Sequence, residues 1–111
     1  MIGKKEQFLK DIFKKIRPIN PYKVIIFGSA ITDKFHEDSD IDLVVILNKK
    51  GIAKNYKERI ENRRTVSKLL RDIRKKIPID LFVYTKDEWE LLKKSGSTFY
   101  RKIEEKGRIL I

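Results

Sequence analysis

The stretch Ser39-Asp40-Ile41-Asp42-Leu43-Val44-Val45-Ile46-Leu47 decides how this chain folds. Residues 41–47 form a nearly unbroken aliphatic run, which is typical of a central strand covered on both faces. Side chains of a strand alternate between its faces, so Asp40 and Asp42 should project in the same direction. Two neighbouring carboxylates repel each other, and a divalent cation between them relieves the repulsion. The stretch therefore predicts a buried strand with a metal site at its head.

The residues before this stretch predict a helix and a second strand. Apolar residues recur at helical spacing over residues 4–16, and prolines follow. Residues 22–27 are β-branched and aromatic and stop at Gly28-Ser29, which predicts a strand. Residues 29–39 are polar and leave room for only a short helical turn.

The residues after residue 47 predict one long helix and then shorter elements. From Ile52 to about Lys76 apolar residues keep a period close to 3.6, which predicts a helix with these residues on its buried side: Tyr56, Ile60, Val66, Leu69, Leu70, Ile73 and Ile77. Pro78 ends it. The elements expected next are a strand over 79–84, a helix over 86–94 with Thr85 and Glu88 as its capping box, a helix over 97–106 and a short edge strand over 108–111. This order predicts an α+β fold, a two-layer αβ sandwich in which a small mixed sheet packs against helices.

Length and composition limit the classes of function. At 111 residues the chain is expected to form a single domain, 1–111. The net charge of +11 favours polyanions such as nucleoside triphosphates and nucleic acid, or an acidic protein surface. The absence of cysteine excludes disulfides, thiolate zinc sites and a cysteine nucleophile. No run approaches the ~20 apolar residues of a membrane span, so we expect a soluble cytoplasmic protein.

The basic residues are concentrated in the expected long helix. Residues 54–76 carry ten Lys and Arg against only Glu58, Glu61 and Asp72. A basic helix face is commonly just solvated. The excess here leads to the hypothesis that it meets RNA or an acidic partner, in which case rising salt should weaken binding.

Two further features complete a candidate site. Asp80 lies at the head of the strand expected over 79–84, and if that strand lies beside residues 41–47, three acids converge at one sheet edge. Three acids can hold two metal ions about 3.5–4 Å apart. Gly28-Ser29 adds backbone N–H groups and a hydroxyl that can hold phosphate oxygens.

Each of these residues also has a purely structural explanation. Asp40 and Asp42 can form a turn that opens a strand. Asp80 can pair with a lysine at a strand edge. Ser29 can be only a helix cap.

Taken together, the residues resemble the signature of the DNA polymerase β type nucleotidyltransferase superfamily. The resemblance lies in Gly28-Ser29, in Ser39-Asp40-Ile41-Asp42-Leu43 and in Asp80 as third acid, and the short chain is most similar to the minimal nucleotidyltransferases. The implied catalytic acids and Mg²⁺ ligands are Asp40, Asp42 and Asp80, and the implied nucleotide contacts are Gly28, Ser29 and Ser39. The implied nucleotide substrate is ATP.

The resemblance also implies a partner. Minimal nucleotidyltransferases are antitoxin-like partners of HEPN-domain proteins, and they transfer AMP from ATP to a tyrosine of that toxin, which silences its ribonuclease activity. The implied role is that of the antitoxin in a toxin–antitoxin pair, within a hetero-oligomer or as a homodimer.

One part of the motif departs from the family. Minimal members usually continue Gly-Ser-x-Ala-Arg-Gly, whereas Ile31, Thr32 and Asp33 stand in the last three places here. The missing arginine is a fork-shaped phosphate donor. This departure motivates an alternative, an interaction protein with weak or no catalysis that neutralises its partner by binding. A third interpretation, a transferase acting on RNA ends, would need an added recognition subunit.

Overall fold

The computed structural model describes residues 4–27 and 41–111, with side chains from residue 6 onward in the first range. Gly28, Ser29, Ser39 and Asp40, and the helical turn expected within 29–39, lie outside the described residues. The helices are α1 (Lys4–Ile16), α2 (Tyr56–Ser67), α3 (Arg71–Arg74), α4 (Lys86–Lys94) and α5 (Thr98–Lys106), with 3₁₀ turns at Arg17–Ile19 and Lys68–Leu70. The strands are β1 (Lys23–Phe27), β2 (Ile41–Leu47), β3 (Ile79–Thr85) and β4 (Arg108–Ile109).

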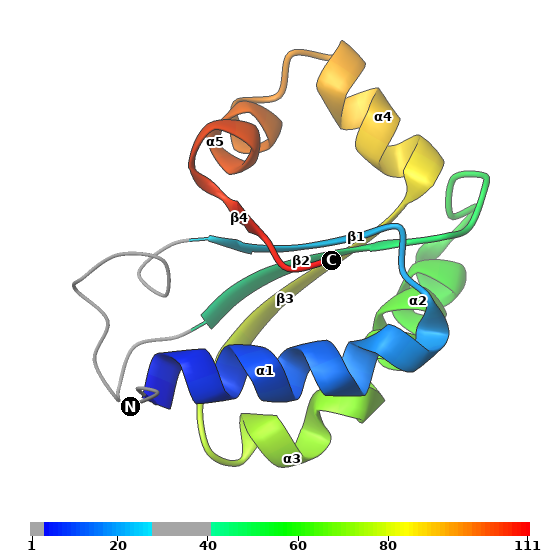
Figure 1. Cartoon of the computed structure of the whole chain (residues 1–111). Coiled ribbons are helices and arrows are strands. Elements are labelled where there is room, and N and C mark those ends of the chain that lie inside the picture. Colours follow the sequence, from blue (N-terminus) through cyan, green and yellow to red (C-terminus); the bar gives the residue numbers. More distant parts are fainter. Residues whose placement is uncertain (1–3, 28–40) are drawn as a thin grey trace.

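The four strands form one mixed sheet in the order β3-β2-β1-β4. Strands β2 and β3 run parallel, and β1 is antiparallel to both β2 and β4. The predicted α+β class, with a small mixed sheet packed against helices, is confirmed. Figure 1 shows helices on both faces of the sheet, with α4 and α5 on one side and α1, α2 and α3 on the other. The fold therefore has one more helical layer than the two layers predicted.

The two faces of β2 contribute to two separate cores. Leu43 and Val45 pack with residues of α1, α2 and α3, whereas Val44 and Ile46 pack with Trp89 of α4 and Ile103 of α5. Residues 43–46 of β2 have no exposed surface. Because both faces are covered, the strand needs the unbroken aliphatic run that its sequence shows.

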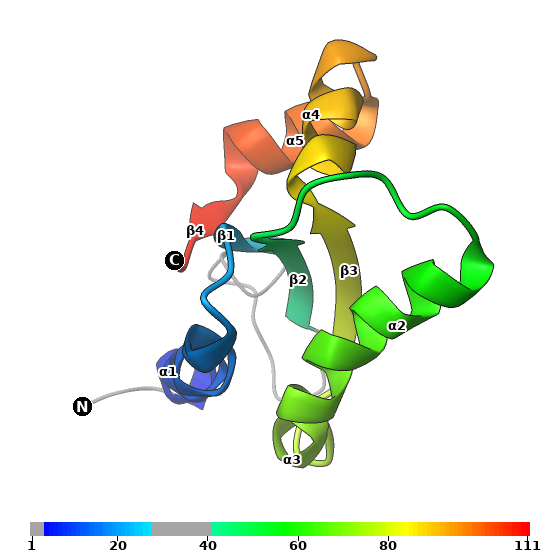
Figure 2. The same ribbon diagram turned by 90° about the vertical axis from the view of Figure 1, so that its right-hand side faces the viewer.

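The helix predicted from Ile52 to about Lys76 is wrong at both its start and its middle. The helix begins only at Tyr56, where the Asn55 side chain accepts a hydrogen bond from the backbone N–H of Glu58, and a 3₁₀ turn separates α2 from α3. Tyr56 and Ile60 were expected to be buried, but they are 77% and 37% exposed. The buried side of α2 carries Asn62 and Val66, four residues apart. Tyr56 lies six residues before Asn62 and Ile60 six before Val66, which places each about a third of a turn away around the helix. Figure 2 also shows the start of α2 pointing away from the sheet.

The segment before α2 is held by the start of α4. The Thr85 hydroxyl donates to the Gly51 carbonyl at 2.6 Å and accepts from the Glu88 N–H at 3.1 Å, and the Glu88 carboxylate accepts from the N–H groups of Thr85 and Ala53. The predicted capping box is therefore confirmed. It also ties residues 51–53 to the carboxyl end of β3.

No helix in the described part of the chain combines the length and apolar character that crossing a membrane requires.

Candidate functional site

Two of the three predicted acids lie side by side. Asp42 is the second residue of β2 and Asp80 is the second residue of β3, and the parallel pairing places them directly opposite each other. Paired residues of neighbouring strands point to the same face, and the strands are ~4.8 Å apart. The arrangement therefore brings two carboxylates together at one edge of the sheet, as the sequence predicted for these two residues.

The end of β1 lies at the same edge. Phe27, the last residue of β1, is the antiparallel partner of Asp42, and Gly28-Ser29 follow it directly in sequence. Asp42 is half-buried and Asp80 is exposed. At this end of the sheet, Asp42 is therefore partly enclosed by the protein, and Asp80 is accessible to solvent.

Three phenylalanines lie next to the acid pair, on the sheet face to which both acids belong. The ring centroids of Phe27, Phe82 and Phe99 are 5.3–5.9 Å apart. Phe82 follows Asp80 by two residues, so the two share a face. We did not predict this cluster. The two-residue spacing of Phe82 from Asp80 was the one sequence signal, since it places both residues on the same face of a strand. The register of that strand with Phe27 and the packing of α5 depend on tertiary structure.

The described part of the acid site suits a hard cation but supplies only two carboxylates. Among the described residues, no group of three or more His, Cys, Asp or Glu side chains is placed to hold a metal ion. Mg²⁺ takes one or two carboxylates together with substrate phosphates and water. Asp42 and Asp80 fit that donor set, and Asp40, the third predicted ligand, lies outside the described residues.

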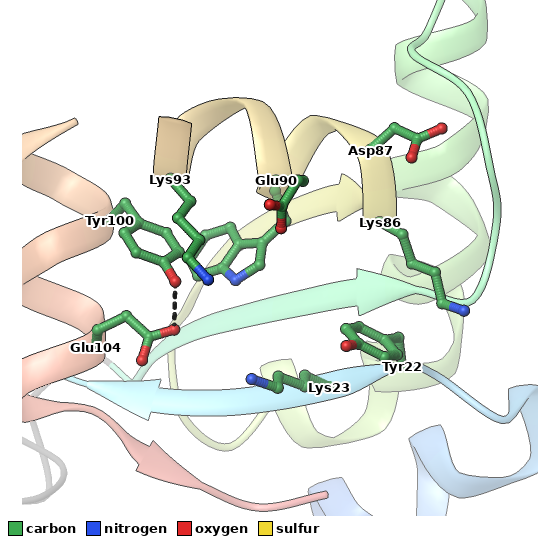
Figure 3. Close-up of a pocket in the computed structure, with 9 residues that line it drawn as sticks. Tyr22, Lys23, Lys86, Asp87, Glu90, Lys93, Tyr100 and Glu104 are labelled. Atoms are coloured by element: carbon green, nitrogen blue, oxygen red, sulfur yellow. Dashed lines mark hydrogen bonds between the residues drawn. The ribbon is translucent and has the colours of Figure 1, made fainter. Parts of the chain in front are cut away.

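A cavity lies at the opposite end of the sheet from the acid pair, on the side of α4 and α5. It has a volume of about 460 Å³, and it opens between Lys23 at the start of β1 and Lys86 and Lys93 on α4 (Figure 3). Lys23 pairs with Ile46, whereas Asp42 pairs with Phe27 at the other end of the same two strands. This cavity is therefore separate from the acid pair.

The phenol of Tyr100, which lines this cavity, should lose its proton only at high pH. Partial burial, then the hydrogen bond that its hydroxyl donates to Glu104 at 2.7 Å and the charge of Glu104, raise the pKa of Tyr100 to about 12. Because the folded pKa exceeds the ordinary value of 10, the protonated phenol stabilises the fold below about pH 10, and this contribution is lost as the pH rises toward 12. Subtracting the phenolate absorbance of Tyr100→Phe from that of the native protein should give a step well above pH 10.

The matched variant for this titration is Glu104→Gln, which keeps the side-chain size and removes the charge. It should move the Tyr100 step toward lower pH. An unmoved step would mean that Glu104 has no part in the shift.

Comparison with known proteins gives one family. A family model described as polymerase beta, nucleotidyltransferase matches residues 7–110. The comparison with curated proteins gives no match.

Proposed function

Because this chain belongs to the polymerase beta nucleotidyltransferase family, we propose that it transfers AMP from ATP to a hydroxyl group of a partner protein. The acceptor we propose is a tyrosine of a HEPN-type toxin, so that the chain acts as the antitoxin of the pair. The family as a whole uses a nucleoside triphosphate and a divalent metal. The observation that carries the proposal is the register of Asp42 with Asp80 on adjacent parallel strands.

The two acids would have different roles. Asp42 is half-buried at the head of the central strand, which suits a fixed Mg²⁺ ligand, and Asp40 would be its neighbour in this role. Mg²⁺, when bound, neutralises the triphosphate and stabilises the pyrophosphate leaving group. Asp80 is exposed, so it can approach an acceptor hydroxyl that arrives from solvent.

The transfer itself is a substitution at the α-phosphorus. Asp80 takes the proton of the acceptor hydroxyl as the acceptor oxygen forms a bond to the α-phosphorus. The bond from that phosphorus to the oxygen bridging to the β-phosphate breaks, and the electron pair leaves with pyrophosphate. Gly28, Ser29 and Ser39 would hold phosphate oxygens during this step.

The position of a radioactive label tests the reaction class. With Mg²⁺ and the HEPN-type protein, label at the α-phosphate of ATP should become protein-bound, whereas label at the γ-phosphate should not. Transfer of the γ-label would identify a phosphoryl transfer and contradict the proposal. If neither the α-label nor the γ-label became bound to any protein, this result would also contradict the proposal.

A second candidate function rests on Thr32 and Asp33, which stand where the family has Arg and Gly. In this case the chain silences its partner by binding alone. Toxin activity measured with Asp42→Asn separates the two functions. Full neutralisation by the variant supports masking, and lost neutralisation supports transfer.

A further inference from the structure

A cavity of about 430 Å³ runs along the outer edge of β3. Within the sheet of the described residues, β3 is the outermost strand on this side. Four consecutive residues, 81–84, line the cavity. Successive strand residues point to opposite faces, so a cavity that touches all four must lie along the edge of the strand and not on one face. We call this cavity the β3 groove.

The two walls of the β3 groove differ in chemistry. Arg59 and Arg63 come from α2, and Leu91 and Leu92 come from α4. Figure 2 shows β3 between these two helices, and the start of α2 lies farther from β3 than its end does. Neither guanidinium has an ion-pair partner among residues 6–27 and 41–111. One wall is therefore basic and the other aliphatic.

The β3 groove also gathers exposed apolar side chains. Leu91 is 53% exposed, Ile52 is 50% exposed and Phe82 is 37% exposed, and all three line it. Tyr56 and Ile60, on the same helix as the two arginines, are exposed as well. Exposed apolar side chains that line one groove beside charged residues, as Ile52, Phe82 and Leu91 do, are typical of an interaction site.

The acidic residue of the groove, Glu88, only partly offsets its positive charge, because it stands against both Arg59 and Arg63. Both carboxylate oxygens of Glu88 accept backbone hydrogen bonds, from Thr85 and from Ala53. Burial and then the charge of Glu88 raise the pKa of Tyr84, and the charge of Arg59 opposes this rise. The net field that an incoming chain meets on the α2 side is positive.

We propose that the β3 groove binds an extended segment of a partner protein in which acidic and apolar side chains alternate. An extended segment beside an edge strand sends alternate side chains to opposite sides. Its acidic side chains would meet Arg59 and Arg63, and its apolar side chains would meet Leu91, Leu92 and Phe82. This inference rests on the proposed function, because the partner that we expect in the groove is the protein that receives the nucleotide.

Two other occupants fit this surface less well. A second copy would bring a net charge of +11 against the same sign of charge, which opposes association. RNA would satisfy the arginines but would leave the aliphatic wall unmatched. The groove begins at Leu81, directly after Asp80, so a segment docked along β3 leads toward the acid pair.

A designed peptide tests the proposal without knowledge of the partner. The probe is a fluorescein-labelled peptide as long as β3 in which Glu alternates with Val, and its isomer carries the same residues in two blocks. Fluorescence anisotropy with the full chain should show tighter binding of the alternating peptide. Arg59→Glu together with Arg63→Glu should weaken this binding about tenfold or more. The same variant should prefer a peptide in which Lys replaces Glu.

The matched control is Arg71→Glu together with Lys75→Glu, which makes the same change of charge at another exposed basic site. Equal weakening by both double variants would mean unspecific attraction and would overturn the proposal. Equal binding of the block isomer would overturn it too. Two further results would overturn the proposal. One is displacement of the peptide by an RNA oligomer whose own binding requires Arg59 and Arg63. The other is a dimer of the native chain that dissociates in the Leu91→Glu variant.

The groove and the proposed reaction can fail separately. Peptide binding needs neither ATP nor Mg²⁺, so Asp80→Asn should bind the peptide as the native chain does. Failure of peptide binding with intact AMP transfer would reject the groove alone. Binding of the peptide without any transfer would reject the reaction alone.

Discussion

Replacing Asp42 with Asn is expected to reduce transfer of the α-phosphate label from ATP by about a hundredfold to a thousandfold, the scale of losing one preorganised electrostatic group. The substitution keeps the shape of the side chain and removes its charge. Asp42 then no longer forms a pair of carboxylates with Asp80 across β2 and β3. The measurement is the initial rate of labelling at saturating Mg-ATP, together with the thermal unfolding midpoint.

The control for this prediction is Asp72→Asn, the same substitution on α3 at an exposed position. It should leave the rate unchanged within error. A native rate in Asp42→Asn would remove Asp42 from the reaction. A lost rate accompanied by a collapse of the unfolding midpoint would make its role structural.

The largest expected loss of stability follows from Trp89→Ala. Trp89 is 5% exposed, and its ring centroid lies 5.0 Å from that of Tyr100 and 5.5 Å from that of Tyr84. It therefore holds α4 and α5 to the sheet. Removing a buried aromatic side chain costs about 3–5 kcal/mol, out of a total of roughly 5–15 kcal/mol for a typical domain. Urea unfolding followed by circular dichroism measures the change.

Two variants bracket this expectation. Trp89→Phe keeps an aromatic ring, and the indole N–H has no hydrogen-bond partner within the described part of the chain, so the loss should be much smaller. Leu91→Ala truncates a half-exposed residue of the same helix and should change stability little. A similar loss in Leu91→Ala would mean that α4 is sensitive along its whole length and that burial does not decide the effect.

The elements that could be predicted from the sequence are those fixed by local chemistry. The aliphatic run 41–47, the Thr85 and Glu88 capping box and the α1 pattern each carry their own signal, and each is found as predicted. The pairing of Asp42 with Asp80 followed from one added assumption, that two strands with an acid near the head are neighbours.

What could not be predicted depends on how the elements pack against one another. The apolar residues Tyr56 and Ile60 suggested a buried side for the helix, yet Asn62 and Val66 form the buried side of α2, and Tyr56 and Ile60 lie about a third of a turn away from it. The β3 groove was missed because no local pattern marks β3 as the outermost strand. The Phe27, Phe82 and Phe99 cluster joins three elements that are far apart in sequence.

The hydrogen bonds of Thr85 and Glu88 have a consequence for how this protein can be altered. They close the carboxyl end of β3, while Asp42 and Asp80 lie at the amino end of the parallel pair. Engineered proteins often lose activity as they gain stability when both properties depend on the same residues. Here the hydrogen bonds of Thr85 and Glu88 are separated from Asp42 and Asp80 by the length of a strand, so the carboxyl end of β3 can be strengthened for heat resistance without altering the acid pair.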